Sequence, residues 1–133
     1  MVIAALLVTA LLFGGMVLYS FGFAAFVFSA LPSDTAGPTI RRAFPYFYLF
    51  VIATSAVAAL LFWPVDRSLS LVVAAIALTG LPARQILMPA INLATDTGAK
   101  ARFKRLHALS VLVTLTHIAL SGWVLSQIPG LAK

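Results

Sequence analysis

The chain has 133 residues, of which 62% are hydrophobic and only 9% are charged. Soluble domains carry about 25% charged residues, so this composition excludes a water-soluble domain and predicts an integral membrane protein. The chain contains no cysteine, which excludes disulfide bonds, thiolate metal sites and a cysteine nucleophile.

Four apolar stretches follow one another along the chain, at residues 2–31, 44–63, 69–93 and 106–128. A bilayer core about 30 Å thick needs about 20 mostly apolar residues per helix. The first stretch lacks the basic start and the short apolar run of a signal peptide, so we expect it to be retained. We therefore predict a single all-α domain over residues 1–133, an antiparallel bundle of four transmembrane helices at about 2–31, 44–63, 69–93 and 104–128.

Turn-forming residues separate the four stretches. Pro32, Gly37 and Pro38 predict a first loop, after which cations give way to aromatic residues before the second helix. Residues 64–68 predict a tight hairpin, and residues 94–105 predict a third loop. We expect the three acidic residues to lie in these loops: Asp34, Asp66 and Asp96.

The net charge of +6 is distributed unevenly. The predicted first and third loops, which share one side of a four-span protein, carry Arg41, Arg42, Lys100, Arg102, Lys104 and Arg105. The opposite side carries Arg67 and Lys133. The positive-inside rule therefore predicts cytoplasmic first and third loops and two outer termini, and the style of the chain points to a bacterial inner membrane.

Basic residues beside a membrane attract anionic lipids, at roughly 1 kcal/mol per charge. We assign the six loop cations to lipid headgroups for this reason, and we expect no nucleic-acid partner. Arg84 is the one charge inside an apolar stretch. We expect its side chain to extend to the cytoplasmic headgroups as well; the alternative is an anion-binding role within the bundle.

Small residues predict where helices approach one another, because they allow close contact between backbones. Such residues recur at helical spacing in the first three stretches, and we assign them to helix packing: Gly15, Gly22, Ser29, Ser55, Ala59 and Gly80.

Two polar stripes lie in the last two apolar stretches. At 100° per residue, one arc of roughly 80° on the fourth helix holds His107, Ser110, Thr114, His117 and Ser121. A similar arc on the third helix holds Pro82, Gln85, Pro89 and Asn92. In a hairpin of these helices Asn92 lies level with His107, Gln85 with Thr114, and Met88 with Ser110. We predict an interhelical hydrogen-bond ladder, helped by backbone carbonyls that the two prolines leave free.

The ladder has three interpretations. It holds helices together through hydrogen bonds worth about 0.6 kcal/mol each, it lines a polar cavity for a small ligand, ion or proton, or it ligates a cofactor. For the third, His107 or His117 would bind haem or copper, with Met16 or Met88 as a further ligand. The two histidines lie ~15 Å apart along the helix, so they do not share one metal ion.

Catalytic patterns are missing from the sequence. No Gly-x-Ser-x-Gly is present, and no carboxylate or third histidine lies within the predicted bundle to support zinc hydrolysis. We therefore expect no enzyme activity, no catalytic residue, no metal site and no bound cofactor.

The order of short motifs along the chain resembles the transmembrane protein 205-like family of small four-helix membrane proteins. The motifs that carry the resemblance cover residues 12–21, 28–32, 36–37, 41, 44–48, 89–92, 96 and 103–110. It implies four spans and no known activity, and it points to Gly15, Ser20, Phe44, Pro45, Asn92, Asp96, His107 and Ser110; His117 matches no motif. Where the family has a proline in its first helix, this chain has Ala24 and Ala25, which puts a kink there in question.

Small-residue seams and aromatic helix flanks favour a non-enzymatic accessory or scaffold subunit of a larger membrane assembly. The alternative is a small transporter or ligand-binding bundle that uses the polar ladder, as a homo-oligomer. A haem- or copper-binding membrane protein is a further alternative.

Overall fold

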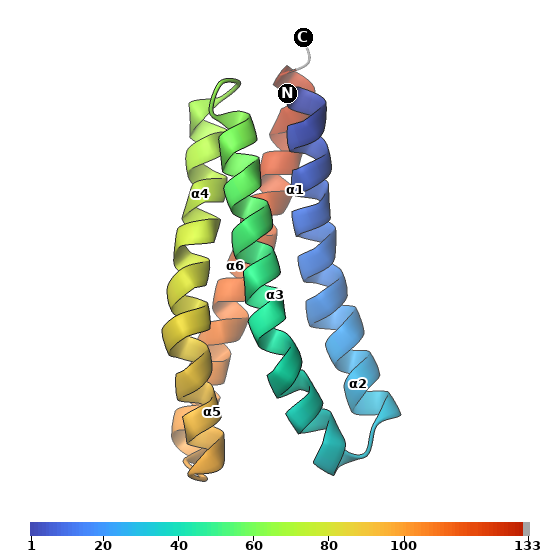
Figure 1. Ribbon diagram of the computed structural model, residues 1–133, viewed down its shortest axis with the longest axis vertical. Coiled ribbons are helices and arrows are strands. Elements are labelled where there is room, and N and C mark those ends of the chain that lie inside the picture. The colour runs from blue at the N-terminus through green and yellow to red at the C-terminus, as the bar shows by residue number, and fades with distance from the viewer. Residues whose placement is uncertain (132–133) are drawn as a thin grey trace.

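The computed structural model describes residues 1–131, and all regular structure in this part of the chain is helical. It forms four rods that run alternately up and down (Figure 1). The first rod comprises α1 (Val2–Val17), η1 (Leu18–Phe23) and α2 (Ala24–Ala30); the second is α3 (Ser33–Phe62); the third comprises α4 (Arg67–Pro82), η2 (Ala83–Leu87) and α5 (Met88–Asp96); the fourth is α6 (Lys100–Leu131). Each rod is long and apolar enough to cross a membrane. The predicted all-α four-helix bundle is therefore confirmed.

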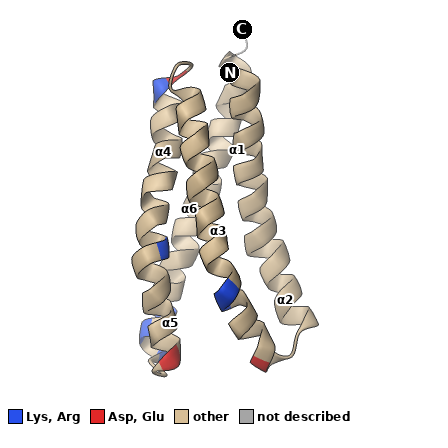
Figure 2. Cartoon of the chain, viewed as in Figure 1, with Lys and Arg blue, Asp and Glu red and all other residues tan. Residues whose placement is uncertain are grey.

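Two ends of the bundle are distinguished by their charges. The end near the N-terminus, where α3 and α4 also meet, is here called the terminal end (Figure 1). The opposite end carries most of the cations, as Figure 2 shows, and is called the basic end. The predicted cationic segments therefore share one end of the molecule. Lys133 lies outside the described residues.

The connections at the basic end are shorter than predicted. α3 begins at Ser33, so the predicted loop over residues 32–43 is wrong, and Arg41 and Arg42 lie on a helix. Likewise α6 begins at Lys100, which leaves a turn of residues 97–99 where Gly98 has a positive φ of 66°. Glycine adopts this conformation without a steric penalty. The four cations of the predicted third loop thus also lie on a helix.

The acidic residues lie at helix ends. Asp34 is in the first turn of α3, and Asp96 is the last residue of α5, so the prediction that both lie in loops is wrong. Asp66 precedes α4, and its carboxylate accepts a hydrogen bond from the Leu69 N–H at 3.0 Å. A carboxylate before the first turn satisfies an amide that has no partner within the helix.

Three rods change their backbone at the same level. η1 and η2 are π-helical, and Pro45 lies within α3. η1 begins 16 residues after Val2 (18 − 2), η2 begins 16 after Arg67 (83 − 67), and Pro45 stands 17 before Phe62 (62 − 45). At 1.5 Å per residue, each lies about 25 Å from the terminal end. We call this shared depth the break level.

The two π-helical segments have different origins. η2 lies between Pro82 and Pro89, and Pro89 has no N–H to continue an α-helical hydrogen-bond ladder. η1 contains no proline, yet the Ala24 N–H bonds the Tyr19 carbonyl five residues earlier. The first rod therefore has an irregular segment without the family's proline, and Figure 1 shows α2 leaning away from α5 and α6 while it stays beside the first part of α3.

Small residues let α3 pack closely against its neighbours. A Cβ atom on Gly15 would lie 2.5 Å from the Phe50 ring, and one on Gly80 would lie 2.9 Å from Ile52. Ser55 is buried and Ala59 half-buried; the Ala59 carbonyl accepts a hydrogen bond from the Ser70 hydroxyl at 2.7 Å. Gly22, within η1, and Ser29, in α2, are exposed instead, so they do not pack against another helix as predicted.

Candidate functional site

Aromatic side chains gather at the break level, where η1 faces α3. The Tyr19 and Phe47 rings stack with centroids 4.8 Å apart, and Phe44 meets Tyr19 edge-on at 6.0 Å. Phe23 and Tyr48 complete this cluster. The Tyr19 hydroxyl is buried and has no hydrogen-bond partner within residues 1–131. A buried hydroxyl without a partner costs about 1–3 kcal/mol, so we regard Tyr19 as a candidate ligand-binding residue.

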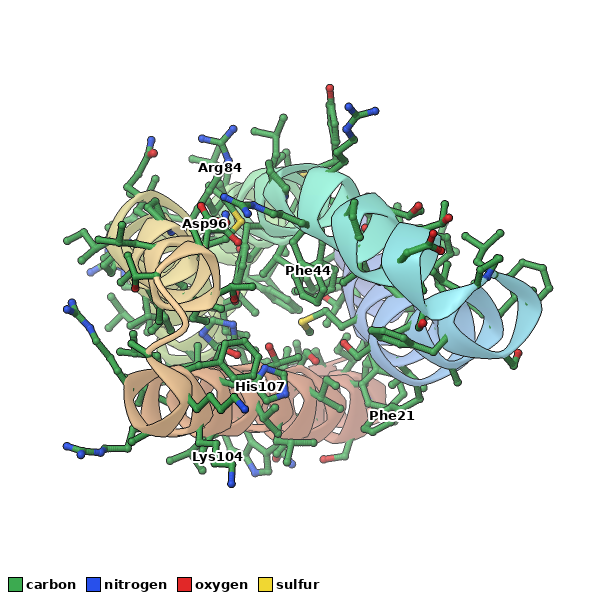
Figure 3. The ribbon with its side chains drawn as sticks, turned by 90° about the horizontal axis from the view of Figure 1, so that it is seen from below. Phe21, Phe44, Arg84, Asp96, Lys104 and His107 are labelled. Carbon is green, nitrogen blue, oxygen red and sulfur yellow. The ribbon has the colours of Figure 1, made fainter. Side chains whose placement is uncertain are left out.

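The fourth rod adds polar groups at this depth. The buried Tyr48 side chain lies near Thr114 of α6. Seen from the basic end, Phe44 and His107 both lie toward the middle of the bundle (Figure 3). His107 is nevertheless exposed, and its ring stacks on Phe103 with centroids 5.5 Å apart. Of the polar stripe predicted on α6, Thr114 is therefore the residue that reaches the core at the break level.

A second polar contact lies near the middle of the rods. The Thr79 hydroxyl lies 2.6 Å from the Ala75 carbonyl and 2.8 Å from His117 Nε2, so it joins α4 to α6 through a hydrogen bond with the imidazole. An open groove of about 270 Å³ lies beside the pair, between α4 and α6. Its lining is Ala75, Thr79, Leu112, Val113, Thr116, His117 and Leu120.

The predicted ladder between the third and fourth rods does not form as drawn. Gln85 is exposed, Asn92 is half-buried, and Ser110 donates to the His107 carbonyl of its own helix at 2.8 Å. Among residues 1–131 no side-chain hydrogen bond joins Asn92 to His107 or Gln85 to Thr114. A stripe at 100° per residue requires a regular α-helix, whereas η2 is π-helical and has a wider turn. The residues beyond Pro82 are therefore rotated away from the predicted face.

The methionines and histidines named as candidate cofactor ligands have different surroundings. Met16 is fully buried in the core that Met88 borders, while His107 is exposed. Within residues 1–131, no group of three or more histidine and acidic side chains gathers where a metal ion could be held.

Besides the Ser70–Ala59 hydrogen bond, two polar contacts tie α3 to the third rod. Arg41 donates to both carboxylate oxygens of Asp96, at 2.6 and 2.8 Å, and we call this ion pair the clasp. Arg84 is half-buried, and its Nε donates to the Pro45 carbonyl at 3.2 Å. Figure 3 shows Arg84 and Asp96 on the same side of the bundle. Arg41, predicted to face headgroups, thus has an acidic partner, and Arg84 is partly held by backbone.

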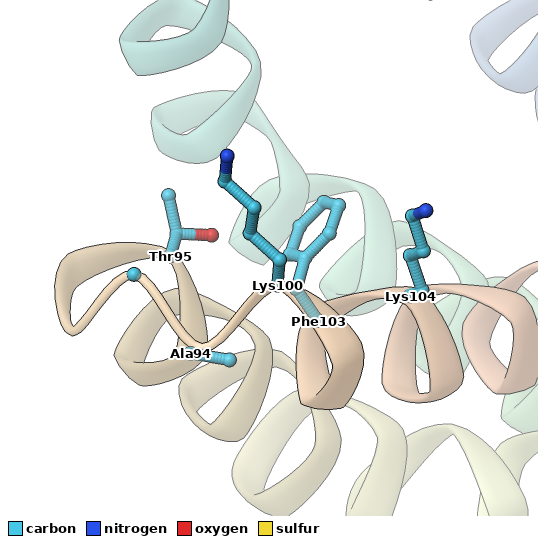
Figure 4. Close-up of a pocket in the computed structure, with 6 residues that line it drawn as sticks. Ala94, Thr95, Lys100, Phe103 and Lys104 are labelled. Atoms are coloured by element: carbon cyan, nitrogen blue, oxygen red, sulfur yellow. The ribbon is translucent and has the colours of Figure 1, made fainter.

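A cavity of about 320 Å³ opens at the basic end, beside the turn between α5 and α6 (Figure 4). Its lining is Ala94, Thr95, Gly98, Lys100, Phe103 and Lys104. The two lysines are exposed and Phe103 is half-buried. Arg102 and Arg105 lie on the same helix but do not line it.

Comparison with known proteins gives one match. Residues 7–100 match a family whose description is domain of unknown function, DUF4149. The match covers the first three rods and ends where α6 begins, at Lys100. No curated protein and no solved structure matches the chain.

Proposed function

We propose that this chain, which belongs to the DUF4149 family, is a non-enzymatic accessory or scaffold subunit of a larger membrane protein assembly. The observation that carries the proposal is the open groove between α4 and α6, which places Thr79, Thr116 and His117 near the middle of the rods. His117 is buried, whereas Thr79 and Thr116 are exposed. A partner helix packed into the groove can offer these two hydroxyls hydrogen-bond partners, which acyl chains cannot.

The groove has the features of a helix-packing surface. Ala75 and Thr79 are small residues four apart on α4, a spacing that lets another helix approach closely. Thr116 is exposed on the α6 side, and its hydroxyl donates to the Leu112 carbonyl at 2.8 Å. We propose that the partner is held by packing and by hydrogen bonds in the groove, with no cofactor.

Native mass spectrometry of the protein extracted gently from its own membranes tests this function. Ala75→Trp fills the groove, and we expect it to weaken association about tenfold, equivalent to about 1.4 kcal/mol. Ala53→Trp is the matched control, because Ala53 is exposed on α3 at a similar depth. We expect this control to keep the complex of the unmodified chain.

Two results would contradict the proposal. One is a wild-type protein that leaves its membranes only as a bare monomer. The other is an equal loss of the complex in the Ala75→Trp and Ala53→Trp variants, which would show that the groove is not the contact surface.

A second candidate function is a small ligand-binding or transport bundle. The unpartnered Tyr19 hydroxyl at the break level favours it, because a bound ligand could supply the hydrogen bond that this buried group lacks. If Tyr19 binds a ligand, Tyr19→Phe removes a small bound mass seen by native mass spectrometry. If it binds none, the variant is as stable as the wild type or more stable, since the unsatisfied hydroxyl is gone.

We further propose that the chain is related to the transmembrane protein 205-like family. In support, two residues that carry the resemblance, Arg41 and Asp96, form the clasp, and Phe44 belongs to the aromatic cluster. We place the protein in a bacterial inner membrane, with the basic end in the cytoplasm.

A further inference from the structure

The rods are longer than a bilayer core requires. They have 29 to 32 residues, which at 1.5 Å per residue is about 44–48 Å, against a hydrocarbon core of ~30 Å. About 15 Å of each rod therefore exceeds the thickness of the hydrocarbon core. The charges indicate at which end this excess lies.

The two ends differ in net charge within residues 1–131. The basic end has six cations, Arg41, Arg42, Lys100, Arg102, Lys104 and Arg105, against Asp34 and Asp96, which leaves +4. At the terminal end Arg67 and Asp66 cancel. The basic end therefore extends into the headgroups, and the 320 Å³ cavity lies at their depth.

The cavity combines cations with an apolar wall. Lys100, Phe103 and Lys104 project on the same side of α6, as their spacing of three and four residues requires (Figure 4). Neither lysine has an acidic partner within residues 1–131, because the neighbouring Asp96 is held by Arg41. The Thr95 hydroxyl, which also lines the cavity, donates to the Ile91 carbonyl at 3.0 Å.

We propose that this cavity is a binding site for the phosphate group of an anionic phospholipid. Lys100 and Lys104 contact the phosphate oxygens, while Phe103 and Ala94 contact the apolar atoms next to the headgroup. This goes beyond the scaffold function, because it needs no protein partner. It also assigns a specific contact to two of the six cations, whereas all six attract an anionic surface without specificity.

Lipid titration of the purified full-length chain in detergent tests the site, with bound lipid measured by native mass spectrometry. The probes are phosphatidylglycerol, phosphatidylcholine and inorganic phosphate. The double variant Lys100→Gln/Lys104→Gln is compared with Arg102→Gln/Arg105→Gln, which removes the same charge from the same helix outside the cavity. We expect the first to weaken phosphatidylglycerol binding about tenfold and the second about twofold at most.

Further arms identify the source of the phosphate and the part played by charge. We expect phosphatidylcholine and inorganic phosphate to compete poorly with phosphatidylglycerol, and Lys100→Arg/Lys104→Arg to restore binding. Circular dichroism checks that all variants remain folded. Equal losses in the two double variants would overturn the site in favour of diffuse attraction. Competition by inorganic phosphate at the same concentration as the lipid would overturn the lipid as the ligand.

Discussion

Gly14 and Gly15 are neighbours in α1, but their surroundings differ. Nothing lies within 4 Å of a Cβ atom placed on Gly14, whereas one on Gly15 would lie 2.5 Å from the Phe50 ring of α3. The absence of a side chain at Gly15 therefore allows α1 and α3 to approach.

We predict that Gly15→Ala lowers the free energy of unfolding by about 1–3 kcal/mol, because Phe50 has to move within a packed interface. Gly14→Ala should leave the free energy of unfolding unchanged or raise it slightly, since alanine favours a helix. Unfolding in mixed micelles, followed by circular dichroism, measures both. If the two variants were equally stable, α1 and α3 would not contact each other through Gly15.

At the scale of single residues, the sequence predicted which polar side chains of α6 face other helices, but it did not predict the residues that they contact. Thr114 and His117 both meet side chains of other rods, but through Tyr48 and Thr79 rather than Gln85. A stripe on one straight helix follows from residue spacing alone. Its partner depends on how the facing helix is rotated, and the π-helical η2 changes that rotation.

At the scale of elements, the clasp joins the first part of α3 to the end of α5. Pro45 separates the first part of α3 from the rest of the second rod, and η2 separates α5 from α4. The clasp therefore joins the two segments that lie between these backbone irregularities and the basic end. Both side chains are substantially exposed, at 43% and 53%, so the clasp contributes more to local order than to global stability.

We predict that Asp96→Asn raises amide hydrogen exchange in residues 33–44 and 88–99 while leaving the terminal end unchanged. The charge swap Arg41→Asp/Asp96→Arg should restore protection, because it rebuilds the ion pair. High salt should weaken protection in the wild type in the same segments, since exposed ion pairs are screened. An exchange pattern that Asp96→Asn leaves unaltered would show that the clasp does not order the basic end.

Hydropathy alone was enough to predict the four rods and their antiparallel order, because apolar runs of this length have few alternatives in a bilayer. The ends of the rods were predicted less well. Gly37 and Pro38 are turn residues in most sequences, yet both lie within α3. At this exposed end, water can satisfy the carbonyl that Pro38 leaves without a partner. The clasp itself joins residues far apart in the sequence, so no local pattern indicates it.

At the scale of the whole molecule, aromatic side chains mark both edges of the apolar region. Trp63 is exposed at the terminal end, where the Arg67 guanidinium lies 5.3 Å from its ring centre. Tyr46 is exposed near the break level. The two are 17 residues apart on the second rod (63 − 46), which is about 25 Å and close to the thickness of a bilayer core. Aromatic belts at this separation place the membrane between them.

The cations at the basic end predict the orientation of the protein, and the cysteine-free sequence makes this orientation simple to measure. Ser68→Cys and Ser33→Cys are a matched pair, because each serine is exposed in the first turn of a helix, at opposite ends of the bundle. With the basic end in the cytoplasm, a membrane-impermeant maleimide should label Ser68→Cys in intact cells and Ser33→Cys only after permeabilisation. The reverse pattern would overturn the orientation. Labelling of both from outside would contradict α3 as a transmembrane helix.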